Sequence, residues 1–187
     1  MTEKLFILDF SWPYSWCGRT AVPCVFEAEI SRKMGIYLWT VHMDGSELIY
    51  YVGETGRDFG TRMLEHFREH CSGGYHIYTP PEFRRGVKIP LWTTIGEFLE
   101  RASELWPAIV ELAGVYRFFC APLESDRRTR ERIEAAIARH LQAQEGLVGG
   151  FQDNGIRYRG RIATELPIPV EIRCCGRFHG LQAALQA

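Results

Sequence analysis

The sequence predicts a mixed α/β fold in which helices flank a three-stranded antiparallel sheet. Runs of β-branched and aromatic residues alternate with longer segments whose apolar residues repeat at helical spacing, in the order strand, strand, helix, helix, strand, helix. The 187 residues are 46% hydrophobic and 24% charged, which is typical of a globular domain and not of a disordered or coiled-coil chain. A chain of this length is expected to form one domain with modest additions.

The first two strands are expected at Gly35–His42 and Leu48–Glu54, which are rich in β-branched and aromatic residues. The segment Met43-Asp44-Gly45-Ser46 joins them, and an Asp-Gly pair between two such runs is a strong hairpin signal. The third strand is expected at Val115–Cys120. We therefore predict that the antiparallel sheet is built from this hairpin and the third strand.

Two of the three helices carry clear N-terminal signals. The first is expected from Asp58 to His70, with the Asp58 carboxylate capping it. The third is expected over Asp126–Gln144, capped by Ser125 and stopped near Gly146.

The middle helix is expected over Ile95–Ala113 and begins at Thr93 or Thr94. Pro107 lies inside it and predicts a kink or a restart, because proline cannot donate a helical hydrogen bond. Residues 71–92 contain glycine and proline pairs and are expected to form a loop insertion.

The core is expected at residues 34–155, with an extension on each side. Residues 1–33 are expected to be irregular apart from one short apolar run at Leu5–Phe10. Residues 156–187 are polar and rich in arginine, and are expected to pack on the core and to end in a short helical tail.

Charge is unevenly distributed along the chain. Residues 127–177 contain ten arginines, no lysine and six acidic residues, a net of +4, while the other residues carry −5, which gives the total of −1. This total argues against a protein that coats nucleic acid by bulk charge. Guanidinium groups suit bidentate phosphate contact, so the arginines are either a phosphate-binding rim or an ordinary solvated surface.

No apolar run approaches the roughly 18 residues of a membrane span, and no secretory signal is recognisable. The six cysteines form no Cys-x-x-Cys pair, which favours free thiols over a structural zinc site. We therefore expect a cytoplasmic protein without a membrane partner.

The segment from Tyr50 to His70 is the densest in candidate functional residues. On the first helix, Arg62 and His66 are four residues apart and lie together on the flank of an apolar stripe. They are expected at the seam between helix and sheet, where a cleft can form. The alternative is a surface arginine and a surface histidine without a role.

Two tripeptides before and around this segment make the pattern more specific. They precede an arginine, a histidine, a glutamate and an asparagine in a fixed order, and the whole set resembles the GIY-YIG nuclease family. The matching residues are Gly35-Ile36-Tyr37, Tyr51-Val52-Gly53, Arg62, His66, Glu134 and Asn154. The resemblance covers about two-thirds of the chain, residues 34–155. The chain departs from it in a slightly long gap of 13 residues between the tripeptides and in the insertion at 71–92.

The resemblance implies a GIY-YIG-like fold and a DNA endonuclease that hydrolyses phosphodiester bonds with a single Mg²⁺ or Mn²⁺ ion. Glu134 would hold the metal, and Arg62 would stabilise negative charge on the phosphate. Either Tyr37 or Tyr51 would activate water or relay a proton, assisted by the metal or by His66. A phenol is a poor base at neutral pH unless a cation lowers its pKa.

DNA is the expected partner. Asn154 would position the substrate, and Arg157, Arg159 and Arg161 would contact phosphates. Aromatic residues of the insertion, such as Tyr75, would either touch nucleic acid or cover the core. A restriction-type or stand-alone enzyme is expected, and a homodimer would allow one active site per strand.

Two alternatives remain open. The first is a catalytically idle or partner-dependent nucleic-acid-binding module on the same fold. The second, a minor alternative, is a zinc hydrolase, because His66-Phe67-Arg68-Glu69-His70 has the His-x-x-Glu-His pattern of one zinc protease class. Two histidines four residues apart can share a zinc ion, with Glu134 as a third ligand.

Overall fold

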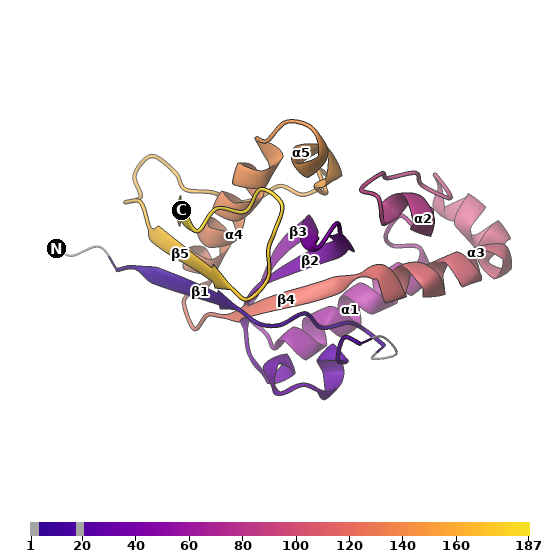
Figure 1. The fold of residues 1–187 in the computed structure, drawn as a ribbon, viewed down its shortest axis with the longest axis horizontal. Coiled ribbons are helices and arrows are strands. Elements are labelled where there is room, and N and C mark those ends of the chain that lie inside the picture. The colour runs from indigo at the N-terminus through magenta and orange to yellow at the C-terminus, as the bar shows by residue number, and fades with distance from the viewer. Residues whose placement is uncertain (1–3, 18–20) are drawn as a thin grey trace.

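Two small sheets and the helices around them make up the fold (Figure 1). The computed structural model describes residues 4–17 and 21–187, so residues 1–3 and 18–20 of the expected N-terminal extension lie outside the described residues. The strands are β1 (Phe6–Phe10), β2 (Gly35–Met43), β3 (Ser46–Thr55), β4 (Arg117–Pro122), β5 (Pro169–Cys174) and β6 (Ala184–Gln186). The helices are α1 (Phe59–Ser72), α2 (Pro80–Phe83), α3 (Ile95–Val115), α4 (Arg127–Gln142) and α5 (Leu147–Phe151), with 3₁₀ turns η1 (Val25–Glu27) and η2 (Glu29–Arg32). The mixed α/β class is confirmed.

The predicted hairpin is confirmed. Strands β2 and β3 pair antiparallel from Gly35 opposite Thr55 to Met43 opposite Ser46. Asp44 and Gly45 join them with φ values of 51° and 74°, the two positive angles that a type I′ turn requires. The Asp-Gly pair therefore sets the position of the turn and the register next to it. Between Trp39 and Thr40 the register shifts by one residue, and Tyr50 is the extra residue on β3.

The third strand, β4, pairs antiparallel with β2, so the central sheet has the order β3–β2–β4. The expected order of three strands and three long helices is confirmed. Strand β4 begins at Arg117 and not at Val115, because α3 continues through Val115. Strand β3 is an edge strand of this sheet, and on its outer side the Tyr50 carbonyl accepts the backbone N–H of Asp153 while the Glu54 N–H donates to Glu134.

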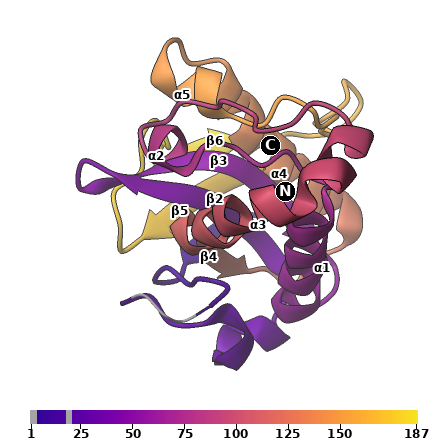
Figure 2. The same cartoon turned by 90° about the vertical axis from the view of Figure 1, so that its right-hand side faces the viewer.

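The central sheet is buried on both faces. Successive side chains of a strand point to opposite sides, so neighbouring residues of β2 belong to different cores. Tyr37 and Trp39 contribute to a core shared with α1 and α3, which lie side by side (Figure 2). Ile36 and Leu38 contribute to a second core with Ile133 of α4 and with residues of β1 and β5. The hairpin is therefore held from two sides.

The second sheet was not expected. Strand β1 runs parallel to β5, which pairs antiparallel with β6, so segments from the two ends of the chain lie side by side (Figure 1). The expected irregular lead-in and helical tail are both wrong here. These strands are only three to six residues long, too short to show their state alone, and β1 gains its partner from the far end of the chain.

Helix termini follow the capping signals with one exception. As expected, the side chains of Asp58 and Thr94 each accept a hydrogen bond from the backbone N–H of the residue three positions later. The cap of α4 is Asp126 and not the predicted Ser125. A carboxylate at that position accepts from both the backbone and the hydroxyl of Thr129, which Ser125, one residue earlier, does not do.

Helix α3 runs through Pro107 without ending there, so of the two predicted outcomes, a kink or a restart, the restart is wrong. Pro107 and Ser103 are both exposed, so the carbonyl that loses its helical partner can bond to water. Beyond α4, the segment near Gly146 does not remain a loop, because α5 follows it directly. Among the described residues, no helix combines the length and the apolar character that crossing a membrane requires.

Candidate active site

The predicted catalytic residues come from four different elements and lie around one end of the hairpin. Tyr37 is on β2 and Tyr51 on β3, with ring centroids 5.9 Å apart. Arg62 and His66 come from α1, which packs on the same face of the sheet. Glu134 comes from α4 and reaches the outer edge of β3, where it accepts the backbone N–H of Glu54 at 2.9 Å.

Tyr37 connects Arg62 to His66. Its side chain is fully buried, its hydroxyl lies 2.7 Å from Nε2 of His66, and it accepts a hydrogen bond from Nε of Arg62 at 3.2 Å. The other ring nitrogen of His66, Nδ1, lies 2.8 Å from the hydroxyl of Tyr75. The spacing of Arg62 and His66 by four residues therefore places both side chains on one phenol.

The His66 imidazole is neutral at physiological pH. Burial, together with the charge of Arg62, lowers its pKa to about 3. A neutral imidazole has one donor and one acceptor nitrogen, so His66 accepts from one of its two tyrosine neighbours and donates to the other. Tyr75, His66 and Tyr37 thus form a continuous chain of hydrogen bonds.

Both signature tyrosines hold their protons at neutral pH. Burial raises the pKa of Tyr37 well above its usual value, and burial followed by the charge of Glu134 raises the pKa of Tyr51 to about 12. Arg62 lowers both values in part, but burial outweighs it. Arg62 is thus the neighbouring cation that tyrosine chemistry needs, but its charge alone does not lower either pKa enough to make the phenol a base at neutral pH.

Arg62 is held as a permanent cation. Burial opposes its charge, but contacts with Tyr37, Glu65 and Tyr51 outweigh burial and keep its pKa above the usual value. Its Nη1 donates to Glu65 at 3.1 Å while Nε donates to Tyr37. A planar guanidinium fixed by two partners is well placed to bind two oxygens of a tetrahedral phosphate.

Glu134 is a partly buried carboxylate without a salt-bridge partner. Burial, with repulsion from the carboxylates of Glu54 and Glu131, raises its pKa to about 7, although the Glu54 N–H and Arg62 act in the opposite direction. The alternative pairing with Arg130 is wrong, because Nε of Arg130 bonds to the Glu54 carboxylate at 3.0 Å. Among the described residues, no basic side chain lies within 4 Å of Glu134.

The donor set around Glu134 suits a hard cation with few protein ligands. The described part of the chain contains no group of three or more His, Cys, Asp or Glu side chains arranged to hold a metal. Magnesium is commonly bound by one or two carboxylates and keeps several waters, so a single uncompensated carboxylate fits it. Manganese accepts the same oxygen ligands.

The zinc hydrolase alternative is not supported by this geometry. Both ring nitrogens of His66 are engaged by tyrosines, and Nε2 of His70 lies 2.9 Å from the carbonyl oxygen of Ile109. His70 is also buried against the indole of Trp16, at 5.3 Å between ring centroids. The two histidines therefore serve hydrogen bonding and packing.

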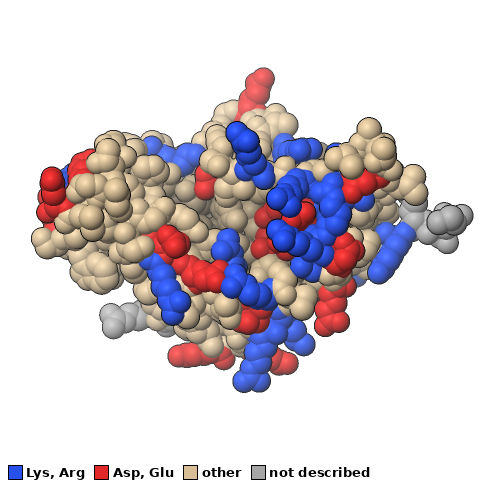
Figure 3. Space-filling view, turned by 180° about the vertical axis from the view of Figure 1, so that it is seen from behind, with Lys and Arg blue, Asp and Glu red and all other residues tan. Residues whose placement is uncertain are grey.

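The residues expected to bind substrate lie in the segment after α5. Asn154 and Arg157 are exposed, and Asn154 follows Asp153, which lines the main pocket. Arg159 lies 3.5 Å from Glu131, and Arg161 donates to the backbone carbonyl of Glu165. Figure 3 shows arginines and lysines gathered mainly on one half of the face seen from behind the view of Figure 1, with acidic side chains among them.

Several other arginines of the expected rim have structural partners. Arg128 pairs with Glu165 at 2.6 Å, and the largely buried Arg132 donates to the backbone carbonyls of Leu166 and Ala187. These side chains fasten the C-terminal segment to α4. The phosphate-binding interpretation is therefore confined to the more exposed arginines beyond residue 156.

The site also includes residues that the sequence pattern did not single out. A pocket of about 340 Å³ opens beside Arg62 and His66. It is lined mainly by aromatic side chains: Trp39, Tyr50, Tyr51, Tyr75, Tyr78 and Tyr116. The sequence held a partial signal, because the insertion carries a short aromatic cluster, but only the fold brings this cluster over β2 and β3.

Comparison of the chain with family models, curated proteins and solved structures gives no match. The resemblance to GIY-YIG nucleases therefore rests on the matching residues themselves. The functional argument rests on how the structure arranges them.

Proposed function

We propose that this protein is a DNA endonuclease that hydrolyses phosphodiester bonds with a single Mg²⁺ or Mn²⁺ ion held at Glu134. The observation that carries the proposal is the convergence of a fixed cation, a pocket-lining phenol and a partly buried carboxylate without a salt-bridge partner. The three residues are Arg62, Tyr51 and Glu134. They interact electrostatically, because the charge of Glu134 raises the pKa of Tyr51 and the charge of Arg62 lowers the pKa of Glu134. Phosphodiester hydrolysis needs an activated water and stabilisation of negative charge on the phosphoryl oxygens.

The Glu134 carboxylate is the single protein ligand in this proposal. When bound there, the ion would supply positive charge near the attacking and leaving oxygens and lower the pKa of a coordinated water. Without a cation, the raised pKa of about 7 leaves Glu134 partly protonated at neutral pH. The site therefore favours the entry of a positive charge.

Arg62 binds a non-bridging oxygen of the scissile phosphate. Its contacts with Tyr37 and Glu65 orient the guanidinium before substrate arrives, so little reorganisation accompanies the reaction. Tyr37 is fully buried and does not line the pocket, so its role is to position Arg62 and His66. The neutral His66 keeps a second positive charge away from Arg62.

Of the two signature tyrosines, Tyr51 lines the pocket, and its hydroxyl orients the attacking water. It carries its proton at neutral pH, since its pKa is about 12. Tyr51 moves a proton to or from water at Oη only once its pKa falls toward the working pH. The exposed Asn154 and Arg157 extend the contact along the DNA backbone, with Arg159 and Arg161.

A plasmid cleavage assay tests the proposal. Wild-type protein is incubated with supercoiled DNA in Mg²⁺, Mn²⁺ or EDTA, beside Tyr51→Phe and a control, Tyr14→Phe, whose tyrosine lies outside the pocket. We expect metal-dependent nicking by the wild type and the control, and a loss of at least a hundredfold in Tyr51→Phe. DNA binding in EDTA should be the same for all three proteins.

A catalytically idle binding module is the second candidate, and one observation favours it. Both signature tyrosines have raised pKa values, so neither is a base before a cation binds. The same assay separates the two candidates. DNA binding by the wild type without cleavage in either metal would replace the endonuclease with the binding module.

A further inference from the structure

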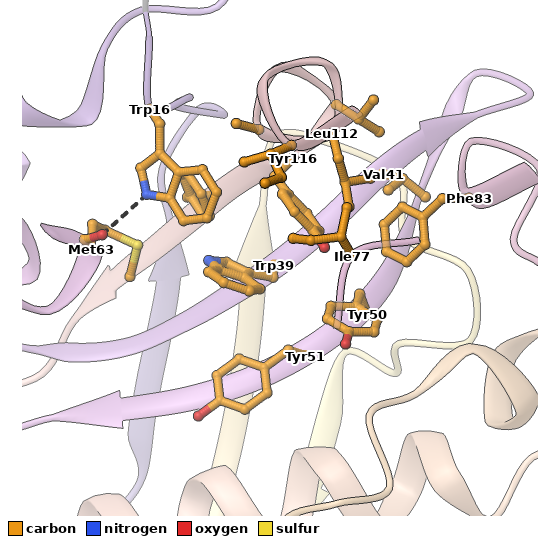
Figure 4. Packing of buried hydrophobic residues seen from close by; sticks show 14 of the residues in the cluster. Trp16, Trp39, Val41, Tyr50, Tyr51, Met63, Ile77, Phe83, Leu112 and Tyr116 are labelled. Carbon is orange, nitrogen blue, oxygen red and sulfur yellow. Dashed lines mark hydrogen bonds between the residues drawn. The ribbon is translucent and has the colours of Figure 1, made fainter. Parts of the chain in front are cut away.

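The aromatic pocket beside Arg62 is a preformed cavity whose lining includes one cationic and one anionic side chain. Its lining comes from both strands of the hairpin, from the insertion at 71–92, from Tyr116 before β4 and from the loop at 153–156. Figure 4 shows the rings of Trp39, Tyr50, Tyr51 and Tyr116 projecting from the same region of the sheet. Its volume of about 340 Å³ is within the range of small-molecule sites.

The rings form continuous walls of π surface. The indole of Trp39 is stacked on Tyr116 at 4.9 Å between centroids with an interplanar angle of 27°, and on Tyr50 at 6.3 Å with an angle of 16°. Tyr78 meets Tyr50 edge to face at 6.1 Å. Tyr75 is held by its hydrogen bond to His66. These contacts fix the rings before any ligand arrives.

Two charged groups line the same pocket. Arg62 is the cation already assigned to the phosphate. Asp153 supplies a carboxylate, of which Oδ1 accepts the backbone N–H of Gly155 at 2.9 Å. A ligand that carries a phosphate, a planar ring and N–H donors matches this combination, and a nucleotide has all three.

We propose that this pocket receives one unstacked nucleobase of the DNA strand, next to the phosphate that Arg62 binds. The inference rests on the proposed function and deepens it by naming the substrate class. Bases inside a duplex cannot reach such a pocket, so the base must be extruded or already unpaired. Aromatic side chains bind unstacked bases through their π faces with little dependence on sequence, and the Asp153 carboxylate can accept from the N–H donors that all four bases carry.

The proposal predicts a substrate preference. Extrusion of a paired base costs free energy, and this cost is smallest for mismatched or single-stranded DNA. The protein should therefore bind a duplex with one mismatch, or a single strand, at least tenfold more tightly than a fully paired duplex. An organic cation would also suit aromatic rings, but the fixed charge of Arg62 in the lining opposes it.

The experiment measures binding in EDTA, so it does not depend on catalysis. Fluorescence anisotropy compares a matched duplex, a duplex with one mismatch and a single strand of the same sequence. The blocking variant is Ile156→Trp, because Ile156 lines the pocket and is 36% exposed, and its control is Ile162→Trp, which is 59% exposed and lies outside the lining. Choline at millimolar concentration is added as a competitor.

We expect Ile156→Trp to lose the tenfold preference while its affinity for matched duplex stays within twofold of the wild type. The Ile162→Trp control should keep the preference. A single strand carrying 5-iododeoxyuridine should also cross-link to pocket residues such as Trp39, Tyr50 or Tyr75. Equal binding of all three DNAs, cross-links only outside the pocket, or displacement by choline would each overturn the proposal.

The outcome is separable from that of the proposed function. Metal-dependent cleavage by a protein that does not distinguish matched from mismatched DNA would leave the endonuclease standing and remove the base pocket. A preference that Ile156→Trp abolishes, in a protein that never cleaves, would keep the pocket and remove the endonuclease.

Discussion

Gly53 faces the ring of Tyr37 across the β2–β3 pair, and a Cβ atom added to Gly53 would overlap that ring, 2.6 Å from Cε2 and closer to Cζ. The glycine that ends the second signature thus makes room for the tyrosine that ends the first. Since Tyr37 positions Arg62 and His66, this packing supports the whole site. The hairpin register, with its shift of one residue between Trp39 and Thr40, places Gly53 opposite Tyr37.

Gly53→Ala should therefore damage both stability and activity. The added methyl group forces the fully buried Tyr37 to move, and we expect a decrease of about 1–3 kcal/mol in the free energy of unfolding. Urea denaturation measures this decrease. The control is Gly114→Ala, in helix α3, where an added Cβ meets nothing within 4 Å and where alanine should stabilise the helix by about 0.5–1 kcal/mol. Equal stability of the two variants would contradict the packing argument.

Glu134→Gln should abolish cleavage and preserve DNA binding. The substitution keeps the size of the side chain but removes the charge that would hold the metal, and we expect a rate decrease of about a thousandfold or more. The variant is compared with Glu145→Gln, an exposed position just beyond α4. Cleavage by Glu134→Gln at near wild-type rate would remove Glu134 from the site.

The raised pKa of Glu134 makes a prediction about stability. The folded state binds more protons than the unfolded state between the ordinary glutamate value of 4.5 and about pH 7. Stability contributed by the protonated carboxyl is therefore complete below this window and is lost as the pH rises through it. At pH 8, Glu134→Gln should be more stable than the wild type by on the order of 1–3 kcal/mol. Equal melting temperatures of Glu134→Gln and the wild type at pH 8 would show that ionisation of Glu134 does not lower the free energy of unfolding.

The lowered pKa of His66 predicts that its ring does not titrate near neutrality. The imidazole should stay neutral from pH 8 down to about pH 4, because its pKa is about 3. The chemical shifts of its ring protons, followed by NMR across this range, test the prediction directly. A midpoint near 6.5, the ordinary histidine value, would show that His66 is solvated and not buried between Tyr37 and Tyr75.

The arginines after Asn154 should govern the salt dependence of DNA binding. Replacing Arg157, Arg159 and Arg161 together by Gln should reduce the log–log slope of affinity against salt by about 0.9 to 2.7, at roughly 0.9 for each phosphate that an arginine no longer neutralises. Arg173→Gln is the control, because Arg173 is exposed on β5 and pairs with Glu171 at 2.7 Å. An unchanged slope in the triple variant would assign this segment to an ordinary solvated surface.

Local signals in the sequence predicted the parts of the fold that local interactions determine. The Asp44-Gly45 turn and the Asp58 cap act within a few residues, and both are confirmed. One wrong prediction is local, because Asp126 and not the adjacent Ser125 caps α4, and the others concern longer-range effects. Pro107 removes one helical hydrogen bond and crowds the carbonyl of Ser103, and whether the helix continues past it depends on the exposure of this turn in the folded chain.

The candidate site shows the same division. The helical spacing of Arg62 and His66 predicted that they share a face, and the structure brings both to one hydroxyl. The degree of burial, which reverses the expected lowering of the tyrosine pKa values, depends on the whole fold and has no local signal. The local sequence pattern also does not predict that Tyr75, which lies outside the signatures, completes the hydrogen-bond chain through His66.

The pairing of β1 with β5 also bears on how the chain folds over time. Phe6 lies beside Val170, so this contact closes a loop that includes nearly the whole protein, whereas the hairpin closes directly over Asp44 and Gly45. Local contacts form fast and long-range contacts slowly, because closing a longer loop costs more entropy. A nascent chain leaving the ribosome would assemble the hairpin early. It would carry β1 without its neighbour until β5 had been synthesised.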